Sequence, residues 1–432
     1  MNYKIDPSKP TILMMTDCPL LHTGQAVVCR EIATGLSKLN KYNVVVAAWG
    51  YNGYPHDLPF LMLPASAKDF GRTGHPEAGV FGIEGIIEQV KPTFLWTIGD
   101  IWMVDYICNL KNRNSFKWVA YTPIDGEPIP HYWDPWFKNP NRLVMETQYG
   151  YDMVKKFNPN IDHRWVYHGC NPRHYYPLPE EARLNVKKAI KYFKITGENN
   201  LSEAQGLDPN DFVVGTLARN QPRKNYDRNL KAFSVFAKDK PNAKLWIHAA
   251  PIDQGYNLVQ LAHVLGIQDK VIFTTRNTIN NGLSEEEMNL VINMWDIHFL
   301  PTQGEGFGIP ILETMSAGVP QVVSDYTSHV EFASKGGLMI PLDPIDDFIT
   351  GLPHPVERAI PKPSVCAATL QALYADNDLR AKLSLSARET AEKMSWEATI
   401  PKWDSIFQEL LQPTQVANAG VVVPNKITTM KF

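Results

Sequence analysis

Short runs of apolar and β-branched residues recur along the first part of the chain, with helix-like stretches between several of them. The strand-like runs lie at residues 11–15, 42–49, 93–98, 118–122, 142–146 and 165–167. Residues 26–39 and 83–90 have helical periodicity. Strands that alternate with helices predict a parallel sheet covered on both faces.

A second series of the same kind begins at Phe212. It predicts strands at residues 212–217, 243–249, 270–275, 296–301 and 320–324. It predicts helices at residues 226–237, 258–265, 284–294 and 311–316. Two successive arrays indicate two doubly wound α/β domains with a cleft between them, and ligands of such sheets bind at the carboxyl ends of the strands.

The boundary between the two series is marked by prolines and polar residues. We place a first domain at residues 1–175, a linker or insertion at 176–210 and a second domain at 211–395. The boundary region combines a charged helical segment at 180–193 with a polar run at 196–211 that has no strand character. Two further irregular stretches are a proline-rich surface excursion at 351–364 and a tail at 413–432.

Composition limits the class of protein but does not indicate a binding partner. The chain has 432 residues, of which 44% are hydrophobic, enough for about two or three domains. A formal charge of −3 gives no bulk attraction to nucleic acid or an anionic membrane. Five cysteines without C-x-x-C spacing argue against a disulfide framework and a structural zinc site. With no signal-peptide pattern and no spanning apolar run, we expect a cytoplasmic protein without a transmembrane segment.

Residues 300–320, LPTQGEGFGIPILETMSAGVP, carry the strongest chemical pattern. A strand ends at Leu300, a turn with Gly304, Gly306 and Gly308 follows, and a helix begins near Pro310. Glycines let backbone N–H groups approach a ligand, and a helix N-terminus adds partial positive charge, so a diphosphate fits here. The alternative is a strand–turn–helix connection that binds no phosphate.

Two glutamates lie within this segment, eight residues apart: Glu305 in the turn and Glu313 in the helix. Carboxylates beside an anion site repel the anion, so an electrostatic role does not explain them. Each can instead accept hydrogen bonds from sugar hydroxyls. The alternative is one solvated carboxylate and one charge that stabilises the helix N-terminus.

The sequence EGFGIPILETMSAGVPQVVS resembles the E-x7-E segment of the retaining glycosyltransferases of family GT4. Upstream, GTLARNQPRKN and LSEEEMNLVINMWDIHFLPT resemble the strand–loop and the helix–strand of the same family. Downstream, MSWEATIPKWDSIFQELL resembles its closing helix, which places residues 396–412 back on the first domain. The resemblance implies a GT-B fold, with two Rossmann-like domains that face each other across a cleft.

The resemblance also implies roles for residues of the second domain. Glu313 would bind the ribose of a nucleotide sugar and Glu305 the transferred sugar. Arg219 and Lys224 would neutralise the diphosphate and stabilise the charge that grows on it in the transition state. The remaining donor-binding candidates are Gly306, Phe307, Gly308, Ile309 and Asn225. Because RNQPRKNYDR is also a charge run, a solvated loop is the alternative for the two cations.

The sequence offers no metal site of its own. Asp376 and Asp378 form a D-x-D pattern, but they lie in a polar helix–helix turn and predict a helix cap. We therefore expect neither metal dependence nor any other cofactor beyond the nucleotide-sugar co-substrate.

The first domain supplies fewer and weaker candidates. Gly24, in the loop before the first helix, resembles the family's N-terminal glycine loop, although many relatives have two adjacent glycines there. Asp125 ends a strand where many relatives carry a histidine; it orients an acceptor or sugar hydroxyl, or it only forms an Asx turn before Gly126. The weaker acceptor candidates are His22, His131, Trp102, Trp133 and Trp136, whose alternative is packing.

The leading hypothesis is a retaining, metal-independent transferase that moves a sugar from a nucleotide sugar, most often a UDP-sugar in this family, to a hydroxyl. The acceptor stays open among a glycan, a lipid-linked sugar, a protein, a small metabolite and a modified DNA base. One alternative is therefore a viral-type glycosyltransferase acting on hydroxymethylpyrimidine bases. Others are a sugar-nucleotide epimerase and a non-catalytic nucleotide-sugar-binding subunit.

Overall fold

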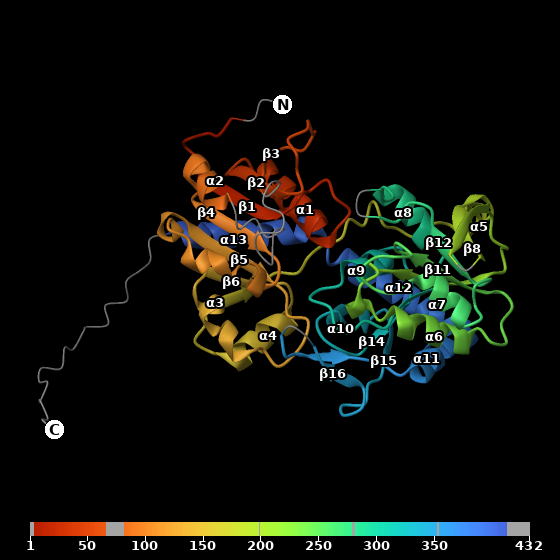
Figure 1. Ribbon diagram of the computed structural model, residues 1–432. Helices are drawn as coiled ribbons and strands as arrows, with labels where there is room; N and C mark the ends of the chain where they lie inside the picture. Colours follow the sequence, from red (N-terminus) through yellow and green to blue (C-terminus); the bar gives the residue numbers. More distant parts are fainter. Residues whose placement is uncertain (1–3, 66–81, 198, 279–280, 352–353, 413–432) are drawn as a thin grey trace, which may run out of the picture.

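The computed structural model describes residues 4–65, 82–197, 199–278, 281–351 and 354–412. These residues form two α/β domains, each built on a mainly parallel sheet with helices packed against it (Figure 1). The predicted fold class, two Rossmann-like sheets in one chain, is confirmed. The predicted tail at 413–432 lies outside the described residues.

The first domain contains a seven-stranded parallel sheet in the order β3-β2-β1-β4-β5-β6-β7. Its strands are β1 (Thr11–Asp17), β2 (Asn43–Trp49), β3 (Leu61–Pro64), β4 (Phe94–Ile98), β5 (Lys117–Thr122), β6 (Arg142–Met145) and β7 (His163–Trp165). Its main helices are α1 (Gly24–Lys38), α2 (Ile83–Val90), α3 (Asp134–Lys138) and α4 (Gln148–Phe157). Every residue of β2 is buried, as expected of a strand covered on both faces. The sequence did not predict β3, an edge strand in which only Met62 is buried.

The second domain contains an eight-stranded sheet in the order β15-β14-β13-β10-β11-β12-β8-β9. Its strands are β8 (Lys191–Gly197), β9 (Asn200–Gln205), β10 (Phe212–Leu217), β11 (Ala243–His248), β12 (Val271–Thr274), β13 (Ile297–Leu300), β14 (Gln321–Ser324) and β15 (Gly337–Ile340). Its helices are α5 (Glu180–Ala189), α6 (Tyr226–Phe236), α7 (Leu258–Val264), α8 (Glu285–Ile292), α9 (Ile309–Ser316), α10 (Val330–Ala333), α11 (Pro363–Ala375) and α12 (Asn377–Glu392). The strands from β15 to β12 in this order run parallel.

The expectation of no strand character at 196–211 is wrong. Strand β8 pairs antiparallel with β12 and with β9, so this hairpin extends the edge of the second sheet. The expected helix at 180–193 accordingly ends at Ala189. An edge hairpin is solvated on one side and needs no continuous apolar run, which is why its polar sequence resembled a linker.

The chain crosses between the domains twice, and the two crossings touch. Cys170, on the outward crossing, forms an isolated parallel bridge with Ser395 on the return. A Cβ on Gly169 would lie 2.4 Å from the backbone N of Trp396, so a side chain at position 169 would push the crossings apart. The returning helix α13 (Trp396–Leu411) then packs against α1 of the first domain (Figure 1).

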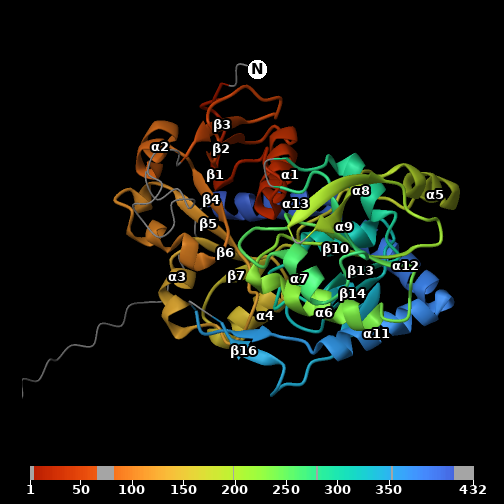
Figure 2. The same ribbon diagram turned by 45° about the vertical axis from the view of Figure 1, so that its right-hand side comes forward.

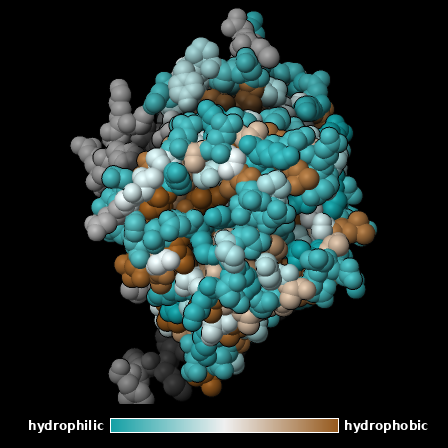
Figure 3. Space-filling model, turned by 90° about the vertical axis from the view of Figure 1, so that its right-hand side faces the viewer, coloured by the Kyte–Doolittle hydropathy of each residue, from teal (hydrophilic) through white to brown (hydrophobic). Residues whose placement is uncertain are grey.

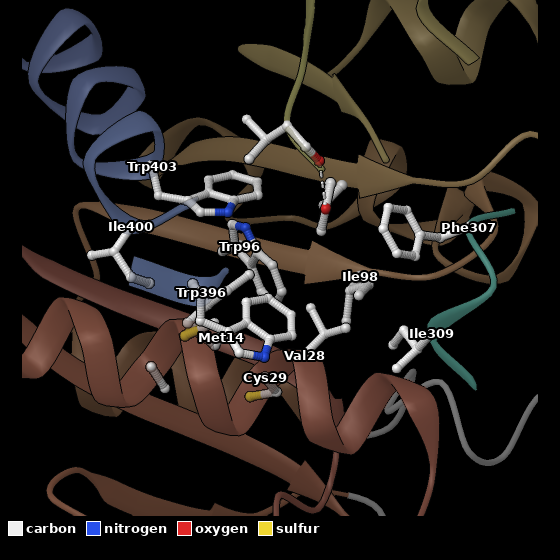
Figure 4. Close-up of a cluster of buried hydrophobic side chains, with 14 of the residues drawn as sticks. Met14, Val28, Cys29, Trp96, Ile98, Phe307, Ile309, Trp396, Ile400 and Trp403 are labelled. Carbon is white, nitrogen blue, oxygen red and sulfur yellow. Dashed lines mark hydrogen bonds between the residues drawn. The ribbon is translucent and has the colours of Figure 1, made fainter. Parts of the chain in front are cut away.

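A hydrophobic cluster joins the two domains. Trp96, on β4, and Trp403, on α13, are fully buried in it, with their ring centroids 5.7 Å apart. Phe307 and Ile309, from the second domain, belong to the same cluster and approach α1 and β4 (Figure 4). The glycine-rich turn that carries the glutamate motif is therefore anchored partly by the core of the other domain.

A short antiparallel hairpin, β16 (Phe348–Thr350) and β17 (Glu357–Ala359), lies beneath the junction of the domains (Figure 2). The proline-rich excursion predicted at 351–364 overlaps this hairpin in part and runs into helix α11, which begins at Pro363. The backbone N–H of Glu357 donates to Glu127 O of the first domain at 2.8 Å, so the hairpin bridges both domains. On the face shown in Figure 3, hydrophilic residues predominate and separate the hydrophobic patches.

Candidate active site

The candidate site lies where the carboxyl ends of strands from both sheets meet. Asp100, Asp125 and Glu146 follow β4, β5 and β6 of the first sheet, and the turn with Glu305 follows β13 of the second. This is the edge at which parallel α/β sheets bind ligands. The five cysteines of the chain have free thiols.

Two glycines allow this close approach of the domains. A Cβ on Gly306 would lie 2.3 Å from Pro123 Cβ, and a Cβ on Gly304 would lie 2.2 Å from Asp125 O. Gly304 also has φ +153°, in a region that favours glycine. The spacing of glycines in the turn thus serves contact between the domains.

The Glu305 carboxylate lies in a buried network of donors. Lys224 Nζ is 2.6 Å from Oε1 and 2.8 Å from Oε2. Arg223 Nη1 donates to Oε2 at 3.1 Å, and the Thr302 hydroxyl donates to Oε1 at 2.7 Å. The Glu305 side chain is only 6% exposed, so these charge-assisted bonds act with little competition from water.

This network shifts the pKa values of both Glu305 and Lys224 below their usual ranges. Burial acts to raise the pKa of Glu305, but the charges of Lys224 and Arg223 outweigh it and hold that pKa well below its usual range. Burial and the charge of Arg223 lower the pKa of Lys224 to about 8, against the attraction of Glu305. At neutral pH, Glu305 is a carboxylate and Lys224 is mostly an ammonium group.

The structure brings Arg223 to this carboxylate, whereas Arg219 lies elsewhere. Arg219 forms a fork with Asp253, with Nε 2.7 Å from Oδ2 and Nη2 3.2 Å from Oδ1. Its side chain is 40% exposed. Arg219 and Lys224 were the cations expected from the sequence, and Arg223 was missed because the order of residues in RNQPRKN does not determine which side chain faces the turn.

Asp125 contacts cations from the second domain. Its Oδ1 lies 2.9 Å from Nη1 of Arg358, on β17, and the same Nη1 donates to Asp125 O at 2.7 Å. Arg223 Nε is 3.9 Å from Oδ2. Asp125 is thus held by an ion pair across the domains.

Two further carboxylates of the first domain were not named from the sequence. Burial and the charge of Asp125 raise the pKa of Asp100 above its usual range, although Arg223 acts in the opposite direction. Glu146 is buried and has its Oε2 3.2 Å from Nε2 of His168. The available signal was their place directly after β4 and β6, the same signal that identified Asp125 after β5.

Two helix N-termini approach each other beside this network. Helix α1 begins at Gly24, where a Cβ would lie 3.6 Å from Ile309 Cδ1, and α9 begins at Ile309 itself. Gly308 precedes α9 with φ +97°, which favours glycine. The positive ends of both helix dipoles therefore lie close together, an arrangement that suits an anion.

Glu313 has an environment unlike that of Glu305. Burial and the charge of Glu285 raise its pKa to about 8, and Arg30 only partly offsets this. Arg30, on α1, instead pairs with Glu285 on α8, with Nη2 2.7 Å from Oε1. At neutral pH the Glu313 carboxyl is mostly protonated.

The other donor candidates have structural contacts in this structure. Phe307 is buried with its ring centroid 4.5 Å from that of His168. The Asn225 amide donates to Pro301 O at 2.8 Å and to Ala359 O at 3.0 Å, which ties the second-domain loops together.

The acceptor candidates divide into three groups. A Cβ on Gly282 would lie 2.7 Å from the His22 ring, so His22 meets the second domain. His131 is exposed and lies near Phe157, with ring centroids 5.9 Å apart.

The three tryptophans gather around His354, from the excursion. Its ring centroid is 5.0 Å from that of Trp102 and 5.2 Å from that of Trp133. Trp136 contacts Trp133, with centroids 6.4 Å apart. This aromatic cluster holds the excursion against the first domain.

Within the described ranges, no three His, Cys, Asp or Glu side chains converge as a metal-ion site. The Asp376 side chain accepts from Leu379 N at 2.8 Å and so caps α12, as the sequence predicted. None of the helices that the structure describes is long and apolar enough to cross a membrane.

Solved structures share this architecture over nearly the whole chain. Sucrose-phosphate synthase from Thermosynechococcus elongatus has a TM-score of 0.70 and 14% identity, covering 93% of this chain and 99% of that one. Anabaena HepE, solved in complex with UDP and glucose, has a TM-score of 0.65 and 13% identity, covering 93% and 100%. The chain is therefore a protein of the GT-B fold.

The sequence comparisons match part of the second domain. Residues 198–348 match the family model described as "Glycosyl transferases group 1", which agrees with the resemblance found in the sequence.

Curated relatives agree over part of their length. The serotype-specific mannosyltransferase WbdA of Escherichia coli is 25% identical over 268 residues, which are 60% of this chain and 30% of that protein. The D-inositol 3-phosphate glycosyltransferase of Salinispora arenicola is 27% identical over 212 residues, 47% of this chain and 42% of that protein. The match thus spans less than half the length of each relative.

Proposed function

We propose that this chain is a retaining glycosyltransferase that moves a sugar from a nucleotide sugar to a hydroxyl acceptor. The observation that carries the proposal is the ionised Glu305, buried between Lys224 and Arg223 beside two converging helix N-termini. A neutral sugar needs hydrogen-bond acceptors and a diphosphate needs positive charge. This site offers both: the Glu305 carboxylate accepts hydrogen bonds, and the helix N-termini supply positive charge.

The diphosphate would lie against the N-termini of α1 and α9, with Lys224 and Arg219 as the cations that the resemblance to family GT4 assigns to it. The positive groups would stabilise the charge that develops on the departing nucleoside diphosphate. Because these groups belong to the chain, we propose that transfer needs no metal ion. Glu305 would accept a hydrogen bond from the transferred sugar in place of one of its four present donor contacts, while Lys224 holds its carboxylate in place.

A UDP-sugar is the proposed donor. HepE, solved with UDP and glucose, shares the fold of this chain, and the resemblance to family GT4 implies the same class of nucleotide. Glu313 would bind the ribose, where its carboxyl group can hydrogen-bond with hydroxyls. Retention would follow from attack of the acceptor on the face that the nucleotide leaves, so no covalent enzyme nucleophile is named.

The first-domain side of the site favours a hydroxyl-bearing acceptor. Asp100, Asp125 and Glu146 all follow strands there, and carboxylates accept hydrogen bonds from hydroxyls but repel phosphates. A DNA-base acceptor therefore ranks second, since its backbone would lie near this acidic edge. If DNA is the acceptor, its affinity will fall steeply with salt; a flat response rules that version out.

A donor screen tests the proposal. Purified protein is incubated with UDP-, GDP- and ADP-sugars, with and without hydroxyl acceptors and with a chelator present, and nucleoside diphosphate release is measured. We expect release from one nucleotide class, unchanged by the chelator. No release from any donor, together with no thermal shift by UDP, GDP or ADP, would overturn the proposal.

A further inference from the structure

Thr327 adopts a backbone conformation that its side chain disfavours. Its φ is +66°, in the left-handed region, and it is buried between β14 and α10. Within the described ranges, the other non-glycine residues with positive φ are Asn40, Lys91 and Asn225. None of these is β-branched, and a β-branched residue is the least suited to this region. Such a conformation persists only where surrounding contacts enforce it.

The contacts of Thr327 explain what this conformation achieves. Its hydroxyl accepts a hydrogen bond from the backbone N–H of Glu305 at 2.9 Å and donates to the backbone carbonyl of Glu305 at 3.1 Å. One side chain thus satisfies both main-chain polar groups of the buried glutamate. Its methyl group also lies against the turn, since a Cβ on Gly304 would be 3.5 Å from Thr327 Cγ2.

The next residue extends the same device across the domains. The Ser328 hydroxyl donates to Ile124 O at 3.1 Å and accepts from the Thr147 hydroxyl at 3.0 Å. Ile124 follows β5 and Thr147 caps α4, so both partners belong to the first domain. The left-handed turn at Thr327 therefore directs one hydroxyl to Glu305 and the following hydroxyl to the opposite domain.

We infer that Thr327 is a positioning residue for Glu305, and this inference rests on the proposed function. The Glu305 side chain is held by Lys224, Arg223 and Thr302, but its backbone in the glycine-rich turn is held by Thr327. A glycine at position 327 would adopt φ +66° without strain, so the threonine is explained by its hydroxyl and not by the turn. Thr327 itself need not touch the sugar.

Three substitutions separate the effect of the Thr327 hydroxyl from the effects of its branched shape and its backbone strain. Thr327→Val keeps the branched shape and removes the hydroxyl. Thr327→Gly relieves the strain and also removes the hydroxyl. Thr327→Ser keeps the hydroxyl and is the matched control, because serine has the same donor and acceptor capacity.

The test measures kcat and KM for nucleoside diphosphate release, the melting temperature, and the hydrogen exchange of the Glu305 amide by mass spectrometry. We expect kcat to fall about 100-fold in Thr327→Val and Thr327→Gly, with the donor KM nearly unchanged, and to stay within about threefold in Thr327→Ser. Thr327→Val and Thr327→Gly both leave the buried N–H and C=O of Glu305 without the Thr327 hydroxyl, so the melting temperature should fall in each. Both kcat values are therefore measured well below the lower melting temperature, so that unfolding does not explain the loss of activity. The Glu305 amide should exchange at least about tenfold faster in the Val and Gly variants.

Wild-type kcat and unchanged amide exchange in Thr327→Gly would overturn the inference, as would equal losses in Thr327→Ser and Thr327→Val. These outcomes differ from failure of the proposed function, in which the wild type itself releases no nucleoside diphosphate. The amide exchange still decides the positioning role in that case, because it needs no turnover.

Discussion

The two glutamates of the motif, eight residues apart, lie in opposite electrostatic environments. Glu305 is surrounded by Lys224, Arg223 and a hydroxyl, and its pKa lies well below the usual range. Glu313 lies near Glu285, and burial raises its pKa to about 8. The same residue type is therefore a fixed carboxylate at one end of the motif and a mostly protonated carboxyl at the other.

This difference shows that the two glutamates of the motif belong to two unlike subsites. A carboxylate neutralised by buried cations can accept hydrogen bonds without repelling a nearby diphosphate. A protonated carboxyl adds no negative charge at all. Both solutions remove the repulsion expected of two carboxylates beside an anion.

The largest expected effect comes from removing the cation of the Glu305 subsite. Lys224→Met leaves a buried carboxylate with Arg223 as its remaining cation, so we expect the free energy of unfolding to fall by about 3 kcal/mol. Urea denaturation measures it, with the exposed Lys238→Met as control. In the double variant Lys224→Met with Glu305→Gln, part of this loss should be recovered. Equal stability of Lys224→Met and the control would contradict the environment described for Glu305.

Opposite pH slopes sharpen the comparison. The pKa of Glu313 is raised from 4.5 to about 8 in the folded state, so its neutral form contributes stability below pH 4.5 that is lost as the pH rises through 8. The melting temperature of Glu313→Gln minus that of the wild type should therefore rise by about 2–4 °C from pH 5 to pH 8.

Glu305 should behave in the opposite sense. Its folded-state pKa is lowered, so its ionised form contributes stability above pH 4.5 that is lost as the pH falls. The deficit of Glu305→Gln relative to the wild type should shrink on acidification below about pH 5. Parallel profiles for the two variants would show that the glutamates share one environment.

A smaller effect is expected from the first-domain side. Asp125→Asn weakens the contact with Arg358 and removes one carboxylate from the edge that would meet the acceptor. We expect kcat/KM for the acceptor to fall about tenfold, equivalent to one hydrogen bond with a charged group. The exposed Asp378→Asn is the control. Unchanged turnover would remove Asp125 from the chemistry.

The smallest effect is expected at the aromatic cluster. Trp136 contacts Trp133 and Tyr132 near the excursion, and Trp136→Phe preserves a ring at that position. We expect kcat/KM for donor and acceptor to stay within about twofold of the wild type. A more than tenfold rise in the KM for the acceptor, with the donor KM unchanged, would make this cluster part of the acceptor site.

The sequence predicted those features of the fold and the site that depend on residue type and order along the chain. Buried strands such as β10 and the strand–turn–helix around Glu305 follow from apolar runs, glycines and a proline, and all were expected. The β8–β9 hairpin was not, because an edge strand needs little hydrophobicity.

Other features depend on long-range geometry. The short helical turn Pro222–Lys224 directs Arg223 and Lys224 together to Glu305, which letter spacing does not encode. Trp133 and His354 meet only after both domains have folded. The left-handed Thr327 opposes its own preference, so no propensity argument finds it.

The most direct test of the central claim is a kinetic comparison of the wild type, Glu305→Gln and Glu313→Gln with the donor that the screen identifies. We predict that Glu305→Gln lowers kcat about 100-fold with little change in donor KM, because the lost carboxylate acts on the transferred sugar. Glu313→Gln should mainly raise the donor KM, by about tenfold, since it binds the nucleotide ribose. Identical kinetic parameters for the two variants, or wild-type rates in both, would contradict the account.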